Sequence, residues 1–178
     1  MKIKTYLITQ AAIIAAAYIA LTMLVAPLAF GQIQFRLSEA LTVLAVLTPA
    51  AIPGLFIGCL LSNILNPMNL GLVDIVFGSL ATLIAAWLTW RMGRSIRSSE
   101  VVRRSQFVWA LLPPVVVNAL IVGTYLPFLL LADQTPTLLV ILLSILTIAI
   151  SEAVVVYLVG GALLFGLRKA KLNLYEKE

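Results

Sequence analysis

The chain has 178 residues, of which 62% are hydrophobic and 11% are charged, and its formal net charge is +5. This length fits one domain, and so apolar a composition is typical of an integral membrane protein, because a soluble domain needs a far more polar surface. The basic residues gather at the chain ends and in one loop. Such a distribution is typical of cytoplasmic segments beside membrane helices and argues against a nucleic-acid-binding protein.

Histidine is absent from the sequence, and Cys59 is the single cysteine. These counts exclude metal sites built on His or Cys, disulfide bonds, and Cys–His or Ser–His–Asp catalysis. We therefore expect a protein that is not an enzyme and that uses no metal and no cofactor.

The first predicted membrane helix covers residues 5–26, since roughly 20 apolar residues cross the hydrocarbon core. The run is too long for the apolar region of a signal peptide, so we expect it to be retained. Alanines lie along it in two rows with a spacing of four, Ala11 and Ala15 in one row and Ala12, Ala16 and Ala20 in the other. Such rows let a second helix approach closely. That helix belongs either to the same chain or to a separate membrane subunit.

A connection at residues 27–36 follows, because Pro27 ends the first helix. Ser38 is a candidate N-cap for the next helix. Glu39 then lies in the first turn, where the helix dipole favours negative charge. This local role leaves Arg36 unexplained, since a positive charge is unfavourable at a helix N-terminus.

Two apolar segments, 37–52 and 54–65, are each short for a membrane span. The prolines between them predict either a tight turn between two short helices or one kinked helix over 37–65. The remaining predicted helices cover residues 74–90, 106–131 and 137–166, and a basic cytoplasmic loop covers 91–105. The alternatives at the prolines give six spans or five.

The positions of the basic residues favour six spans. A six-span model with a cytoplasmic N-terminus leaves Arg36 as the one basic residue of the twelve that does not face the cytoplasm. A five-span model with an outer N-terminus places Lys2 and Lys4 outside, against the positive-inside rule. We therefore predict one all-α membrane domain over residues 1–178, with six transmembrane helices and both termini in the cytoplasm.

Several polar side chains fall in the apolar spans or directly beside them, and a charge near the bilayer centre costs roughly 2.5–3.5 kcal/mol on insertion scales. They are Arg36, Glu39, Asn63, Asp74, Asn118 and Glu152. The six-span model places Asn118 and Glu152 near the middle of the membrane and the others in its outer half, which predicts a polar cavity that opens outward. Asp133 falls in an outer turn, where we expect it to be solvated.

These side chains either satisfy one another, for instance Arg36 with Glu39, or bind a ligand. The charge balance favours a ligand, because Arg36 neutralises only one of the three carboxylates. The other two are then either protonated or matched by something else, and a cationic ligand with several hydrogen-bond donors would match them. Aromatic residues at similar depth are candidates for stacking on a flat ring, and they are Phe30, Phe35, Tyr125 and Phe128.

The stretch Phe-Gly-Gln-Ile-Gln-Phe-Arg-Leu-Ser-Glu-Ala-Leu at residues 30–41 resembles the signature of the QueT family. Its members are substrate-binding (S) components of energy-coupling factor (ECF) transporters. Similar stretches follow at residues 53–59, 74–82, 112–123 and 151–153. The likeness extends to about residue 168, and it is least distinctive in the last span.

The resemblance implies an S-component-like bundle of six helices in the cell membrane that captures a queuosine precursor from outside. The expected ligand is a 7-deazaguanine such as preQ1, or preQ0 or queuine. The implied partners are a transmembrane coupling subunit and two cytoplasmic ATPases, with docking through Ala12, Ala16 and Ala20. The residues that we expect to bind the substrate are Gln34, Phe35, Arg36, Glu39, Asn63, Asp74, Asn118, Tyr125 and Glu152.

Other function classes remain open at this point. One is an S component for a different small cationic or vitamin-like metabolite, and another is a stand-alone secondary transporter. An intramembrane enzyme that uses one of the carboxylates as an acid or base is disfavoured, because no nucleophile–base pair or metal-ligand set accompanies them. The sequence contains no G-x-x-x-x-G-K-[ST] motif, so we expect the energy for uptake to come from partner subunits.

Overall fold

The computed structural model describes residues 2–31, 34–68, 70–99, 102–131 and 134–170, and within these ranges the protein is helical with no strands. The first half contains α1 (Lys2–Leu24), α2 (Ala26–Ala29), the 3-10 helix η1 (Leu37–Val46) and α3 (Ala51–Ile64). A continuous helix follows, made of α4 (Gly71–Val73), the π-helical turn η2 (Asp74–Gly78) and α5 (Ser79–Met92). The short α6 (Arg94–Arg97) and the pair α7 (Arg104–Ala110) and α8 (Leu112–Leu130) come next. The last helix consists of α9 (Leu138–Ala153), the π-helical turn η3 (Val154–Gly160) and α10 (Gly161–Lys169).

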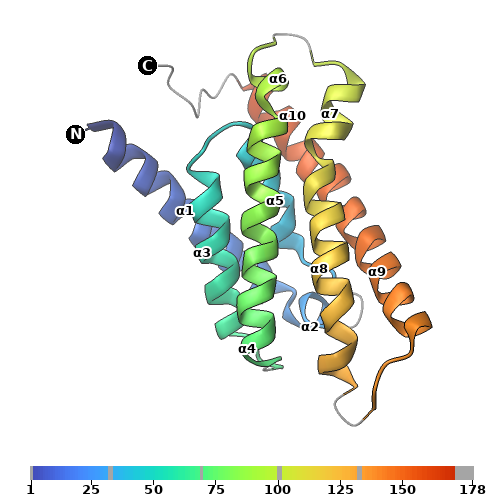
Figure 1. Ribbon diagram of the computed structural model, residues 1–178. Coiled ribbons are helices and arrows are strands. Elements are labelled where there is room, and N and C mark those ends of the chain that lie inside the picture. Colours follow the sequence, from blue (N-terminus) through green and yellow to red (C-terminus); the bar gives the residue numbers. More distant parts are fainter. Residues whose placement is uncertain (1, 32–33, 69, 100–101, 132–133, 171–178) are drawn as a thin grey trace.

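The helices run alternately towards opposite ends of a bundle (Figure 1). One end carries α6, the start of α7 and the end of α10, and the other carries α2, α4 and the connection between α8 and α9. Four helices in the described part of the chain are long and apolar enough to cross a membrane, namely Thr5–Leu24, Gly71–Met92, Arg104–Leu130 and Leu138–Lys169. The prediction of an all-α, multi-pass membrane protein is therefore confirmed, whereas the number of six spans stays a prediction.

The segment with the prolines forms two helices, η1 and α3, and the chain reverses direction between them (Figure 1). Pro53 lies in the first turn of α3. A backbone N–H at such a position has no hydrogen-bond partner within the helix, so proline, which lacks this N–H, costs no hydrogen bond there. Ser38 is not the N-cap of η1, because the N-cap is Arg36, without a side-chain cap. The Ser38 hydroxyl is instead hydrogen-bonded to the hydroxyl of Thr22, 2.7 Å away on α1.

The two alanine rows of α1 have different environments. Ala15 is buried, and Ala11 is partly buried, against α3. A Cβ atom built on Gly54 would lie 2.7 Å from the carbonyl oxygen of Ala11, and one built on Gly58 would lie 2.7 Å from the Cβ atom of Tyr18. The first row therefore packs within the chain. The second row, Ala12, Ala16 and Ala20, is exposed.

We expect Gly58→Ala to lower the apparent melting temperature of the purified protein by several degrees. The added methyl group overlaps Tyr18, and overpacking of this kind costs about 1–3 kcal/mol. Gly166→Ala is the matched control, because a Cβ atom there meets nothing within 4 Å. Equal melting temperatures for the two variants would show that α1 and α3 are not closely packed at Gly58.

Two arginines hold the connections at the end of the bundle that carries α6. Arg97 donates hydrogen bonds to the carbonyl oxygens of Val46 and Trp90, both 2.9 Å long, and its guanidinium lies 3.5 Å from the centroid of the Trp90 ring. Arg168 donates to the carbonyl oxygens of Ile96 and Ser99, both at 2.8 Å. These two side chains therefore have a structural role in addition to their positive charge.

Both π-helical turns adjoin candidate site residues. Asp74 begins η2, and Glu152 lies two residues before η3. Such turns in long helices are frequent at functional sites, because the inserted residue changes the direction of the side chains around it. A close contact brings η3 onto η1, since a Cβ atom built on Gly160 would lie 2.6 Å from Cγ1 of Val43. This packing brings the two glutamates of the candidate site, Glu39 and Glu152, towards each other.

Candidate functional site

The buried arginine of the predicted site pairs with Asp74, not with Glu39. Arg36 is 5% exposed, and its Nη2 atom lies 3.6 Å from Oδ1 of Asp74. Its Nε–H donates a 3.2 Å hydrogen bond to the carbonyl oxygen of Ala29, and its guanidinium lies 5.3 Å from the centroid of the Phe30 ring. Backbone, aromatic ring and carboxylate together fix the position of this charge.

Asp74 is the centre of a group that we call the Asp74 cluster, made of Arg36, Asn63, Asp74 and Tyr125. The Tyr125 hydroxyl donates a 2.8 Å hydrogen bond to Oδ1 of Asp74. The Asn63 amide donates a 3.0 Å hydrogen bond to the backbone carbonyl oxygen of the same residue. A Cβ atom built on Gly78 would lie 2.9 Å from Nδ2 of Asn63 and 3.2 Å from the Tyr125 hydroxyl. Glycine at this position therefore leaves room for the cluster.

A second group, the glutamate cluster, contains Tyr18, Glu39, Thr82, Asn118 and Glu152. Oε1 of Glu39 accepts hydrogen bonds from the Tyr18 hydroxyl and from Thr82, the latter 3.3 Å long. Oε1 of Glu152 accepts a 2.9 Å hydrogen bond from Asn118. Both glutamates are almost fully buried, at 1% and 4% exposure, and neither forms an ion pair with a described residue.

Half of the ten described side chains that have a buried polar atom without a hydrogen-bond partner belong to the two clusters. Each carboxyl group of the clusters has one such oxygen, and these are Oε2 of Glu39, Oδ2 of Asp74 and Oε2 of Glu152. Oδ1 of Asn63, Nη2 of Arg36 and Nε2 of nearby Gln34 are also without one. Because buried polar groups in proteins are normally hydrogen-bonded, and because three of the five cluster side chains are carboxylates, the two clusters are a candidate place for a polar ligand.

Comparison with known proteins gives the same family as the sequence motifs. Residues 8–169 match the family described as QueT transporter. The chain belongs to the QueT family. The family is one of transporters and not of enzymes, and the chain is a multi-pass membrane protein.

One curated relative of this QueT family chain is the queuosine precursor transporter QueT of Lactococcus lactis subsp. cremoris (strain MG1363). The two sequences are 41% identical over 85 residues, which is 47% of this chain and 48% of the relative. The alignment thus spans about half the length of the curated relative. No solved structure matches the chain.

The structure buries most of the polar residues that the sequence predicts for this QueT site. Six of them lie in the two clusters, namely Arg36, Glu39, Asn63, Asp74, Asn118 and Glu152. Gln34 is buried, and its φ angle of 47° lies in the left-handed region. Residues other than glycine rarely adopt this conformation, and it occurs preferentially at functional sites. Asp133 lies outside the described residues, as do Lys171 and Lys177.

The structure places the aromatic candidates in different surroundings. Phe30 is fully buried beside Arg36, whereas Phe128 is 51% exposed, and stacking of these rings on a ligand stays a prediction. Phe35 is partly exposed, and its backbone N–H donates to the carbonyl oxygen of Leu28. Tyr125 contributes its hydroxyl to the Asp74 cluster, while its ring lines an apolar groove of about 530 Å³ between α5 and α8.

Two residues of the glutamate cluster are missing from the sequence-based site, Tyr18 and Thr82. Threonine is frequent in membrane helices, where its hydroxyl bonds to the backbone of its own helix, and tyrosine is common near membrane interfaces, so neither residue has a signal as strong as a buried charge. Thr82 closes the stretch 74–82 that resembles the family, which is the clue that was available. Tyr18 lies on the face of α1 that packs on α3, opposite the exposed alanine row.

Proposed function

We propose that this chain is the substrate-binding component of an ECF-type importer, and that it captures a queuosine precursor of the 7-deazaguanine class from outside the cell. In this proposal, a transmembrane coupling subunit and two cytoplasmic ATPases supply the energy for uptake. The Lactococcus relative is a queuosine precursor transporter, which supports the substrate class. The importer type rests on the resemblance of residues 30–41 to the signature of QueT family S components.

The observation that carries the proposal is the pair of buried glutamates without a cation. Arg36 is paired with Asp74, so no described cation is paired with Glu39 or Glu152, and each of these glutamates has an oxygen without a hydrogen-bond partner. Removing one ionised group from water costs several kcal/mol unless a partner is present. A 7-deazaguanine with an aminomethyl group provides a cation, N–H donors along its guanidine-like edge, and a carbonyl acceptor.

Native mass spectrometry of the purified protein tests the substrate class directly. We expect a bound species with the mass of a 7-deazaguanine, released on unfolding and absent from the Glu39→Gln/Glu152→Gln variant. A different small cation at this site would favour the alternative of an S component for another metabolite. Uptake by cells that persists after deletion of the ATPase subunits would contradict the importer mechanism and favour a secondary transporter.

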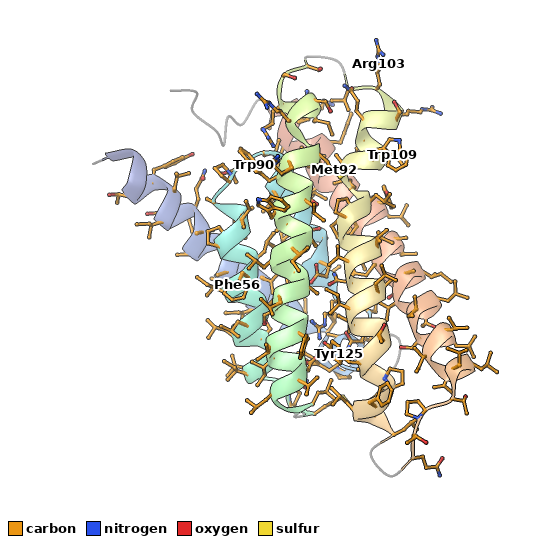
Figure 2. The ribbon with its side chains drawn as sticks, viewed as in Figure 1. Phe56, Trp90, Met92, Arg103, Trp109 and Tyr125 are labelled. Carbon is orange, nitrogen blue, oxygen red and sulfur yellow. The ribbon has the colours of Figure 1, made fainter. Side chains whose placement is uncertain are left out.

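The proposed orientation has both termini in the cytoplasm and six spans. Its support is the set of exposed basic side chains at one end of the bundle, Arg91, Arg94, Arg103, Arg104 and Lys169. Figure 2 shows Arg103 and the interfacial Trp90 and Trp109 towards this end, and Tyr125 of the Asp74 cluster towards the opposite half. The Asp74 cluster is then nearer the outer surface than the glutamate cluster.

Cysteine labelling tests this orientation. In a Cys59→Ser background we expect Met68→Cys to react with a membrane-impermeant maleimide added to intact cells, and Ser98→Cys to react only after lysis. Both positions are at the surface of the bundle, near opposite ends. The reverse labelling pattern would show that the protein has the opposite orientation in the membrane, with the Asp74 cluster nearer the cytoplasmic side.

The exposed row Ala12, Ala16 and Ala20 is the proposed docking face for the coupling subunit. We expect Ala16→Trp to reduce uptake at least tenfold in the assembled transporter and to leave ligand binding by the isolated chain unchanged, because small residues allow close approach of membrane helices. Ile150→Trp is the control, since Ile150 is exposed on α9 and lies mid-helix. Equal uptake by the two variants would exclude this row as the docking face.

A further inference from the structure

The two clusters differ in the kind of polar atom that they leave without a hydrogen-bond partner. In the Asp74 cluster these atoms are a donor, Nη2 of Arg36, and acceptors, Oδ1 of Asn63 and Oδ2 of Asp74. In the glutamate cluster they are carboxylate oxygens only, Oε2 of Glu39 and Oε2 of Glu152. One cluster thus presents mixed donors and acceptors, and the other presents acceptors alone.

Their charges differ in the same way. Asp74 is neutralised by Arg36, so the Asp74 cluster has no net charge when both groups are ionised. The close packing of η3 on η1 brings the carboxyl groups of Glu152 and Glu39 towards each other. Their only described polar partners are the uncharged hydroxyls of Tyr18 and Thr82 and the amide of Asn118. When both glutamates are ionised, the glutamate cluster is therefore the part of the site with an unbalanced negative charge, which a cation would neutralise.

The clusters also lie at different depths in the bundle. Asn118 and Tyr125 are seven residues apart on α8, which separates them by about 10 Å along the helix axis at 1.5 Å per residue. On the helix formed by α4, η2 and α5, Thr82 of the glutamate cluster and Asp74 of the Asp74 cluster are also separated along the axis, in the same direction. A flat bicyclic base with a short side chain is long enough to reach from one cluster to the other.

From these differences we infer how the ligand is oriented and why the site is selective. The Asp74 cluster binds the neutral guanidine-like edge and the carbonyl of the base. Glu39 and Glu152 bind a positively charged side chain of the ligand. This inference rests on the proposed function. The edge N–H groups donate to Asn63 and Asp74, and the ligand carbonyl accepts from Arg36. An ammonium group donates to the free oxygens of both glutamates, which makes the site selective for cationic over neutral 7-deazaguanines.

The lone pairs of the glutamates fit this assignment. A carboxylate offers about four acceptor sites, two on each oxygen. Oε1 of Glu39 already accepts two hydrogen bonds, from Tyr18 and Thr82, so its second oxygen is the one left for a ligand. A single acceptor atom from each glutamate suits an ammonium group, which has three donors that point in different directions.

Two probes that differ in charge test the inference, 7-aminomethyl-7-deazaguanine and 7-cyano-7-deazaguanine. Each is titrated calorimetrically into ligand-free, purified, full-length protein. We expect the wild-type protein to bind the amine at least tenfold more tightly than the nitrile. Glu152→Gln should weaken binding of the amine by about 10- to 100-fold, since it removes a charge-assisted hydrogen bond, and should leave binding of the nitrile within about threefold. Glu39→Gln should behave in the same way, and provides a second test if the first variant does not fold.

Asn63→Ala is the contrasting variant, because it changes the Asp74 cluster without changing any charge. This substitution should weaken the binding of both probes by a similar factor and leave the ratio of their affinities unchanged. The inference is overturned if the nitrile binds as tightly as the amine to the wild-type protein, or if Glu152→Gln weakens the binding of both probes equally. Binding of neither probe would contradict the proposed substrate class itself, and the orientation with it.

Discussion

Replacing Asp74 by leucine should lower the apparent melting temperature of the purified protein by roughly 10 °C. The substitution leaves Arg36 buried without its counter-ion, and breaking a buried ion pair from one side costs about 3–5 kcal/mol. Thermal unfolding in detergent, followed by tryptophan fluorescence, measures the change.

The double variant Arg36→Met/Asp74→Leu is the control for this prediction. It removes both charges and should recover most of the lost stability, because an apolar pair of similar volume replaces a buried ion pair at little cost. If the double variant is as unstable as Asp74→Leu, the loss comes from the hydrogen bond donated by Tyr125 or from packing, and not from an uncompensated arginine.

The double variant Glu39→Gln/Glu152→Gln should bind the cationic 7-deazaguanine at least about 100-fold more weakly than the wild-type protein. Each substitution removes a charged acceptor, and a hydrogen bond to a charged group contributes about 1.5–3 kcal/mol. Equilibrium binding to the purified protein measures the loss.

The same variant should be as stable as the wild-type protein, or more stable, in the absence of ligand. The amide has nearly the shape of the carboxyl group, and the variant no longer buries two carboxyl groups that have no paired cation. Unchanged affinity would remove both glutamates from the binding site. Weak binding accompanied by a large fall in melting temperature would assign them a structural role instead.

Charge in an apolar segment is the reason that so much of the site was predictable. A buried charge in a membrane is costly, so each one is informative without knowledge of the fold. Arg36, Asp74 and Glu152 come from distant parts of the chain, and the structure buries all three and joins the first two in an ion pair. The presence of membrane helices was also predictable, since an apolar run of about 20 residues is typical of a membrane-spanning helix.

The pairing of these charges was not predictable. Which carboxylate meets Arg36 depends on how η1 and α4–η2–α5 are rotated about their axes, and one residue in a helix turns a side chain by 100°. The π-helical turns η2 and η3 change that rotation beside Asp74 and Glu152. The sequence provided no signal for these insertions, and none for the hydroxyl of Tyr18 that holds Glu39.

The small residues of α1 illustrate the limit of spacing as a signal. Both alanine rows have the spacing that allows close helix packing. Only the row with Ala11 and Ala15 packs on α3, because Gly54 and Gly58 lie opposite it. The sequence shows that α1 has two candidate packing faces, and the structure shows which of them the chain itself covers.

Titration of ligand-free, purified protein with 7-aminomethyl-7-deazaguanine tests the central claim most directly. The account predicts saturable binding of one molecule per chain, lost in the Glu39→Gln/Glu152→Gln variant and retained in Gly166→Ala. Failure to bind this or any other 7-deazaguanine, while the same preparation binds a different metabolite, would contradict it.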